Sequence, residues 1–195
     1  MRRTYAATVA LAFLATACTG GGDADPKPTG RGSEPVPLIA TDPCPEPQTL
    51  LAEKPKGDNL LPDVELKCLG HEGAVAMRSL GGRPYVVNIW AAWCGPCRTE
   101  MPEFQKVYVD LKDRVGFLGV NTKDFDREAR SAVQRAAISY PSVVDVEEKI
   151  RRAVNARTVP ATIFVAVDGT IADVHVGQMT EAELRAAIRE NLGVE

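Results

Sequence analysis

The fold is decided by residues 86–102, which read Val-Val-Asn-Ile-Trp-Ala-Ala-Trp-Cys-Gly-Pro-Cys-Arg-Thr-Glu-Met-Pro. Residues 85–91 are almost continuously apolar, which is typical of a strand buried on both faces. Residues 95–112 then carry large apolar side chains at helical spacing, and Pro102 is expected to kink that helix. The sequence therefore predicts a buried strand that turns directly into a helix, with two cysteines at the turn.

Cys94 and Cys97 form a C-x-x-C motif in the first turn of the predicted helix. The start of a helix offers unsatisfied N–H groups and the positive end of the helix dipole, and both favour a thiolate over a thiol. Gly95 and Pro96 fit this turn, because the N–H that proline lacks has no partner there anyway. We predict that Cys94 is the attacking sulfur and that Cys97 resolves the mixed disulfide.

Other uses of a C-x-x-C motif fit the sequence poorly. A zinc site needs a second pair of ligands, but His71 and His175 stand alone and no second C-x-x-C is present. A c-type haem site needs histidine directly after the second cysteine, where this chain has Arg98. A purely structural disulfide would not need the strand-to-helix position. We therefore predict a redox dithiol, with no metal and no cofactor.

Outward from the motif, the chain alternates predicted strands and helices. Asp168-Gly169 joins the two strands of a late hairpin, and a capping box of Thr180 and Glu183 opens the last helix. The expected strands cover residues 64–69, 74–77, 85–91, 115–120, 143–144, 161–167 and 170–176, and the expected helices cover residues 95–112, 126–137, 146–154 and 181–192. This order predicts an α/β fold: a mixed sheet with helices on both faces and an N-terminal β-hairpin extension.

Composition limits the class of protein. The 195 residues are 45% hydrophobic and 25% charged, which suits one globular domain with a tail. The net charge of −3 argues against a general nucleic-acid partner, because few basic groups remain to neutralise phosphates. No apolar run approaches 20 residues, so a polytopic membrane protein is excluded.

The N-terminus has the pattern of an export signal. In residues 1–17, Met1 is followed by two arginines, an apolar stretch and a small-residue end. Residues 14–18 resemble a lipobox ending at Cys18. We predict lipidation of Cys18 and anchoring to the membrane. The alternatives are a plain secretory signal or a short uncleaved anchor. Residues 18–58, rich in Gly and Pro, are expected to form a flexible tether, and residues 59–195 the domain.

With Cys18 set aside, four cysteines remain, and they allow three pairings. The simplest pairing joins Cys94 to Cys97 and Cys44 to Cys68. The second bridge would close a loop of about 25 residues and contribute on the order of 3–4 kcal/mol in an oxidising compartment. Two unrelated thiols, or a second redox couple, are the alternatives for Cys44 and Cys68.

Residues 60–192 resemble the thioredoxin fold, and more narrowly the membrane-tethered extracytoplasmic thioredoxins of the TlpA/ResA type. The resemblance rests on residues 86–102 and on Thr158-Val159-Pro160-Ala161-Thr162. It implies that Pro160 is a cis proline facing the C-x-x-C motif and that the backbone of Val159 pairs with an extended substrate. Trp93, Gly95 and Pro96 would then lie on the same substrate-binding surface.

Two positions near the motif bear on its chemistry. Asn88 occupies the place of the buried acid of cytosolic thioredoxin, and an amide cannot take up a proton in that role. Glu100 is the carboxylate nearest in sequence, and the resembled family carries a glutamate there. We hypothesise that Glu100 tunes the two thiols or acts as a base for Cys97. The alternative is a solvated glutamate on the helix surface.

The sequence thus favours a thiol–disulfide oxidoreductase outside the cytoplasmic membrane. The resemblance suggests that it reduces disulfides in exported proteins, including the cysteines of apocytochrome c, with electrons from a membrane thiol carrier. A disulfide-forming oxidase is the alternative, supported by Asn88 and an oxidising compartment. A redox-inert module that holds extended peptides is a third possibility. A secreted rather than anchored protein is the alternative for location.

Overall fold

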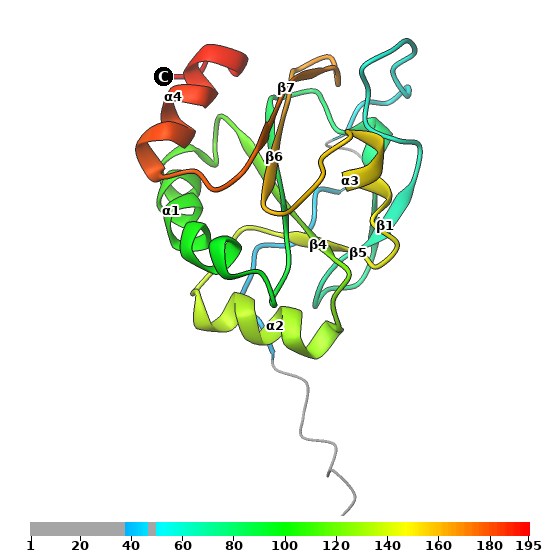
Figure 1. The fold of residues 1–195 in the computed structure, drawn as a ribbon. Helices are drawn as coiled ribbons and strands as arrows, with labels where there is room; N and C mark the ends of the chain where they lie inside the picture. The colour runs from blue at the N-terminus through cyan, green and yellow to red at the C-terminus, as the bar shows by residue number, and fades with distance from the viewer. Residues whose placement is uncertain (1–37, 47–49) are drawn as a thin grey trace, which may run out of the picture. The chain divides into compact units, whose positions relative to one another are not determined.

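The computed structural model describes residues 38–46 and 50–195. Strand β3 (Tyr85–Trp90) lies in the middle of a five-stranded sheet with the order β5-β4-β3-β6-β7 (Figure 1). Strands β4 (Gly116–Thr122) and β5 (Ser142–Asp145) continue the sheet in parallel, whereas β6 (Ala161–Val165) and β7 (Ile171–Val176) are antiparallel. Every side chain of β3 is buried. The predicted mixed sheet is therefore confirmed.

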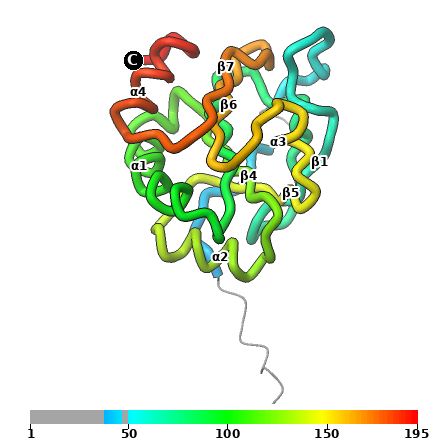
Figure 2. Tube along the Cα trace, in the orientation of Figure 1, coloured from blue at the N-terminus to red at the C-terminus, as the bar shows by residue number. Residues whose placement is uncertain are grey.

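Helices and a hairpin cover the two faces of the sheet. Helices α1 (Gly95–Leu111), α2 (Asp126–Arg135) and α4 (Glu181–Leu192) contribute to one core, together with side chains from β3, β4 and β6. The hairpin of β1 (Glu65–Lys67) and β2 (Ala74–Ala76), a short 3-10 helix η2 (Met77–Ser79) and helix α3 (Lys149–Ala153) belong to the second core. The chain trace in Figure 2 shows α1 and α4 side by side, and the two helices contact each other.

Local signals in the sequence account for several element boundaries. Thr180 Oγ1 accepts the N–H of Glu183 at the start of α4, and Gly193 ends that helix in the left-handed conformation. Helix α3 is shorter than the predicted helix over residues 146–154. Its start is set by Asp145, whose carboxylate accepts the N–H groups of Lys149 and Ile150. Residues 146–148 therefore remain outside the helix.

Residues 41–46 contact the domain, although the sequence assigned them to the tether. Cys44 is joined to Cys68 by a disulfide, and the Asp42 N–H donates to Ser139 O at 2.7 Å. The Tyr108 hydroxyl donates to the Asp42 carboxylate. Further along, Leu51 N donates to Ser79 O at 2.9 Å. The folded unit thus begins before residue 59, because these bonds hold a Pro-rich segment that lacks regular structure of its own.

Three predictions lie wholly or largely outside the described residues: the export signal over residues 1–17, the lipidation of Cys18, and the first part of the tether. In residues 38–46 and 50–195, no helix combines the length and apolar character needed to cross a membrane.

Candidate functional site

The site is built where β3 ends and α1 begins. Cys94 is the N-cap residue of α1, with an extended backbone, and its Sγ accepts the N–H of Cys97 at 3.1 Å. The two sulfurs form a disulfide with 5.3 Å between the Cα atoms. Cys97 is fully buried, whereas Cys94 keeps a small exposed fraction of 4%. Cys94 is therefore the sulfur that a substrate reaches first.

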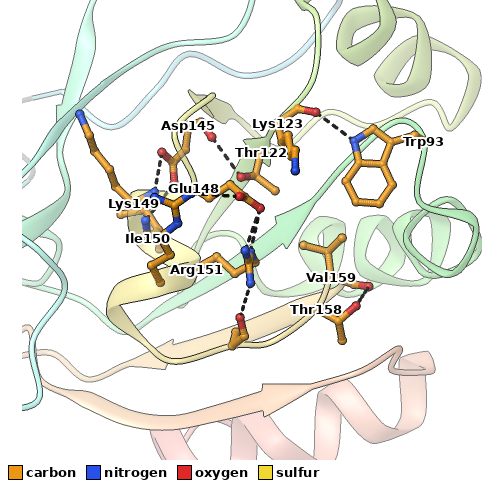
Figure 3. Close-up of polar contacts among 12 residues, drawn as sticks. Trp93, Thr122, Lys123, Asp145, Glu148, Lys149, Ile150, Arg151, Thr158 and Val159 are labelled. Carbon is orange, nitrogen blue, oxygen red and sulfur yellow. Dashed lines mark hydrogen bonds and ion pairs between the residues drawn. The ribbon is translucent and has the colours of Figure 1, made fainter.

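The loop before Cys94 is fixed by contacts with the loop that follows β4. The Trp93 indole N–H donates to Lys123 O at 3.0 Å (Figure 3), and the ring stays 58% exposed beside the disulfide. The Ala92 N–H donates to Asp124 Oδ2 at 2.5 Å. Asp124 also accepts from Asn121 and from the backbone of the next residue. Asp124 thus ties the two loops together, and sequence reasoning did not identify it.

An open groove runs beside Trp93 and along the length of α2. Its lining residues are Ala92, Trp93, Asp124, Phe125, Arg127, Glu128, Ser131 and Arg135. Phe125, like Trp93, is a large exposed apolar side chain, with 79% of its surface accessible. Two exposed aromatic rings on one groove, one of them from the residue that precedes Cys94, suit contact with a polypeptide that carries apolar side chains.

Val159 and Pro160 lie at the same end of the sheet as the disulfide. Ala161, the first residue of β6, pairs with Ile89 near the end of β3, and these strands are antiparallel. The start of β6 therefore adjoins the end of β3. The Val159–Pro160 peptide bond is cis, as the resemblance implies. Val159 is half-buried and packs against the core that includes both cysteines.

The segment before Val159 is held by Arg151 of α3, which Figure 3 shows together with Glu148 at the N-cap of that helix. Arg151 forms an ion pair of 2.9 Å with Glu148 and donates to Ala156 O at 2.7 Å. The Thr158 hydroxyl donates to Val159 O at 3.2 Å. These contacts fix the backbone that leads from α3 into Pro160.

Glu100 is fully buried in α1, so it is not a solvated helix-surface residue. Its Oε1 accepts from Asn88 Nδ2 at 2.8 Å, and its Oε2 accepts from Met179 N at 3.1 Å. Burial raises the pKa of Glu100 to about 7, and the two hydrogen bonds act in the opposite direction. A carboxyl group with this pKa can take up or release a proton near neutral pH.

The structure brings most of the expected site residues together. Trp93, Gly95 and Pro96 flank the disulfide at the start of α1, and Val159 and Pro160 lie at the adjoining strand end. The Cys44–Cys68 disulfide lies apart from these residues. The backbone of Cys68 forms an isolated β-bridge with Val143 of β5, and its side chain belongs to the second core.

A mixed five-stranded sheet of order β5-β4-β3-β6-β7, with a C-x-x-C at the turn from β3 into α1, defines a thioredoxin-fold protein. Its two cysteines are a redox-capable pair. The Redoxin family model matches residues 55–188, so the chain belongs to the Redoxin family. The resemblance to TlpA/ResA-type thioredoxins is confirmed by similar proteins.

Thioredoxin-like protein YneN of Bacillus subtilis is 30% identical over 126 residues, which cover 63% of this chain and 73% of that protein. Thiol-disulfide oxidoreductase ResA of Halalkalibacterium halodurans is 33% identical over 109 residues, or 55% of this chain and 62% of that protein. Among solved structures, MTB dsbF in its mixed oxidised and reduced forms has a TM-score of 0.60 at 26% identity. That match covers 66% of this chain and 94% of dsbF.

Proposed function

We propose that this chain is an extracytoplasmic thiol–disulfide oxidoreductase that reduces disulfides in exported proteins through Cys94 and Cys97. The observation that carries the proposal is the place of Cys94 at the N-cap of α1, with its Sγ accepting the Cys97 N–H. The same hydrogen bond and the helix dipole would stabilise a thiolate at Cys94 in the reduced protein.

In the first step, the Cys94 thiolate attacks one sulfur of a substrate disulfide. A bond forms between Cys94 Sγ and that sulfur, and the other substrate sulfur leaves as a thiolate. Attack at Cys94 rather than Cys97 follows from exposure, since Cys97 is fully buried.

In the second step, Cys97 attacks Cys94 Sγ and closes the disulfide between them. The first substrate sulfur then leaves as a thiolate, so the substrate has gained two electrons in all. The Cys97 thiol must lose its proton before it attacks. Glu100, three residues later on α1 with a pKa of about 7, is the proposed base.

The substrate would lie as an extended segment along Val159, whose backbone precedes the first residue of β6. Apolar side chains next to the substrate cysteine would contact Trp93 and Phe125, which are exposed on the groove beside the disulfide. This surface suits binding of an unfolded or locally extended segment rather than a folded domain.

The place of the protein in the cell is part of the proposal. The export signal and lipidation of Cys18 would anchor the chain at the outer side of the membrane by a tether. Reduction there requires a source of electrons, for which we propose a membrane dithiol carrier that reduces the Cys94–Cys97 disulfide. Disulfides of apocytochrome c are one candidate substrate.

The proposal is tested by trapping the mixed disulfide. Reduced Cys97→Ser protein is mixed with a disulfide-bonded peptide that contains apolar residues, and the adduct is measured by mass spectrometry. We expect a stable adduct at Cys94, and none with the matched Cys94→Ser variant. Equal adduct formation by both variants would contradict the assigned roles. If the unmodified protein showed no thiol–disulfide exchange, the oxidoreductase proposal would fail, and a redox-inert peptide-binding module would remain.

A further inference from the structure

Arg151 of α3 binds both backbone groups of Ala156. Its guanidinium Nη1 donates to Ala156 O at 2.7 Å, and its own carbonyl oxygen accepts the Ala156 N–H at 3.0 Å. The first of these bonds is charge-assisted, because the guanidinium is always ionised. Ala156 is buried, with 2% of its surface exposed. One residue of α3 therefore fixes Ala156 at both its N–H and its carbonyl group.

The guanidinium of Arg151 is itself held by Glu148. Glu148 Oε1 accepts from Arg151 Nε at 3.0 Å and lies 2.9 Å from Nη2. The two side chains are 19% and 13% exposed, so solvent screens this ion pair less than it screens a surface pair. The guanidinium is planar and its donors have fixed directions. With Nε and Nη2 directed at Glu148, the third nitrogen is left to point at Ala156.

Helix α3 is attached to the same loop as Trp93. The carboxylate of Asp145 accepts the first N–H groups of α3. Its carbonyl oxygen accepts from the Thr122 hydroxyl at 3.0 Å and from Lys123 N at 3.4 Å. Lys123 O in turn accepts the Trp93 indole N–H, and Figure 3 shows these residues together. The helix that carries Arg151 and the ring beside Cys94 are thus fixed to the same pair of strand ends.

Val159 lies between two fixed points of the backbone. On one side is Ala161, the first residue of β6, which pairs with Ile89 of β3. On the other side is Ala156, which Arg151 holds. A segment that is fixed at both ends has less conformational entropy to lose when a peptide binds along it. Arg151 thereby prepares the Val159 backbone for binding.

We propose that Arg151 is a positioning residue that holds Val159 ready for extended polypeptide substrates and is not needed for exchange with small disulfides. The inference rests on the proposed function, because it requires that substrate lies along Val159. An extended peptide gains affinity from main-chain hydrogen bonds to a backbone that is already in place. A small disulfide has no such backbone and needs only Cys94, whose sulfur is held at the start of α1.

The test compares two substrates of the reduced full chain. One is a disulfide-bonded linear peptide with apolar residues beside its cysteine, and the other is hydroxyethyl disulfide, which has no peptide backbone. The rate of a single oxidation of Cys94 and Cys97 is measured as substrate concentration rises. We expect Arg151→Met to raise the half-saturating peptide concentration about tenfold, the size expected for loss of one charge-assisted hydrogen bond. The limiting rate and the rate with hydroxyethyl disulfide should stay within about twofold of wild type.

Arg152→Met is the matched control. Arg152 is the next residue of α3 and also pairs with Glu148, at 3.4 Å, but its side chain is 70% exposed and its guanidinium does not hold Ala156. This variant should leave all three quantities unchanged. The inference is overturned if Arg151→Met has the half-saturating concentration of Arg152→Met, or if it slows both substrates equally.

A second variant decides the case if Arg151→Met does not fold. Glu148→Gln keeps the shape of the side chain but removes the charge that orients the guanidinium, so it should raise the half-saturating peptide concentration by a smaller factor. An unchanged value would again overturn the inference. The proposed function fails in a different way. If neither substrate oxidises the wild-type chain, the oxidoreductase proposal is wrong and the role of Arg151 falls with it. If both substrates do, only the role of Arg151 is at stake.

Discussion

Asn88 of the central strand and Glu100 of the redox helix are joined by a buried hydrogen bond of 2.8 Å. The bond connects the strand that leads into Cys94 with a carboxyl group one turn after Cys97. Because Asn88 cannot ionise, the only carboxyl group in this contact is that of Glu100, and burial keeps its pKa near 7. The group that can take up a proton at this contact therefore lies on helix α1 and not on strand β3.

Glu100→Gln should change how stability depends on pH. The pKa of Glu100 is about 7 in the folded chain, against 4.5 as its ordinary value, so the folded state binds the proton more tightly than the unfolded state. Protonated Glu100 stabilises the folded state relative to the unfolded state. This stabilisation is complete below pH 4.5 and is lost as the pH rises to about 7. Relative to the wild type, the variant should gain up to about 3 kcal/mol over that interval, measured by urea unfolding. A difference that stays constant with pH would contradict the raised pKa.

Asp124→Asn should loosen the turn that carries Trp93 and Cys94. Asparagine keeps the shape of the side chain but provides one acceptor oxygen where Asp124 uses two, so the Ala92 N–H or another donor loses its partner. We expect a loss of about 1–2 kcal/mol in unfolding free energy and slower disulfide exchange. The matched change at the exposed Asp173 should alter stability by less than about 0.5 kcal/mol. Equal effects at both positions would refute the role of Asp124.

Replacing both Cys44 and Cys68 with serine should destabilise the chain without removing its redox chemistry. The bridge spans 24 positions of sequence and ties residues 41–46 to the domain. The loop-closure model gives a loss of about 3–4 kcal/mol, measured by urea unfolding of oxidised proteins. Disulfide exchange by Cys94 should persist at the wild-type rate. Loss of exchange in a folded double variant would show that the second bridge takes part in the reaction.

Local sequence patterns were sufficient for much of the architecture. The apolar run of β3, the capping box at Thr180 and the Asp168-Gly169 turn each specify an element through neighbouring residues alone, and each lies as predicted. The C-x-x-C motif was likewise readable, because its chemistry depends on its place at a helix start.

Contacts between distant segments were not readable from the sequence. The partner of Asp124 is 32 residues away and is a backbone group, which no side-chain pattern reveals. The burial of Glu100 depends on Asn88 and on Met179, which lies 79 residues later. The packing of residues 41–46 depends on backbone bonds such as that from Asp42 to Ser139. Only the folded arrangement brings these groups together.

The direction of electron flow is tested most directly by the equilibrium reduction potential of the Cys94–Cys97 couple, measured against glutathione. A reductase with Gly95 and Pro96 between its cysteines should give a value of about −270 mV, at the thioredoxin end of the scale. A value of about −120 mV, at the end typical of strong oxidants, would contradict the reductase and favour a disulfide-forming oxidase.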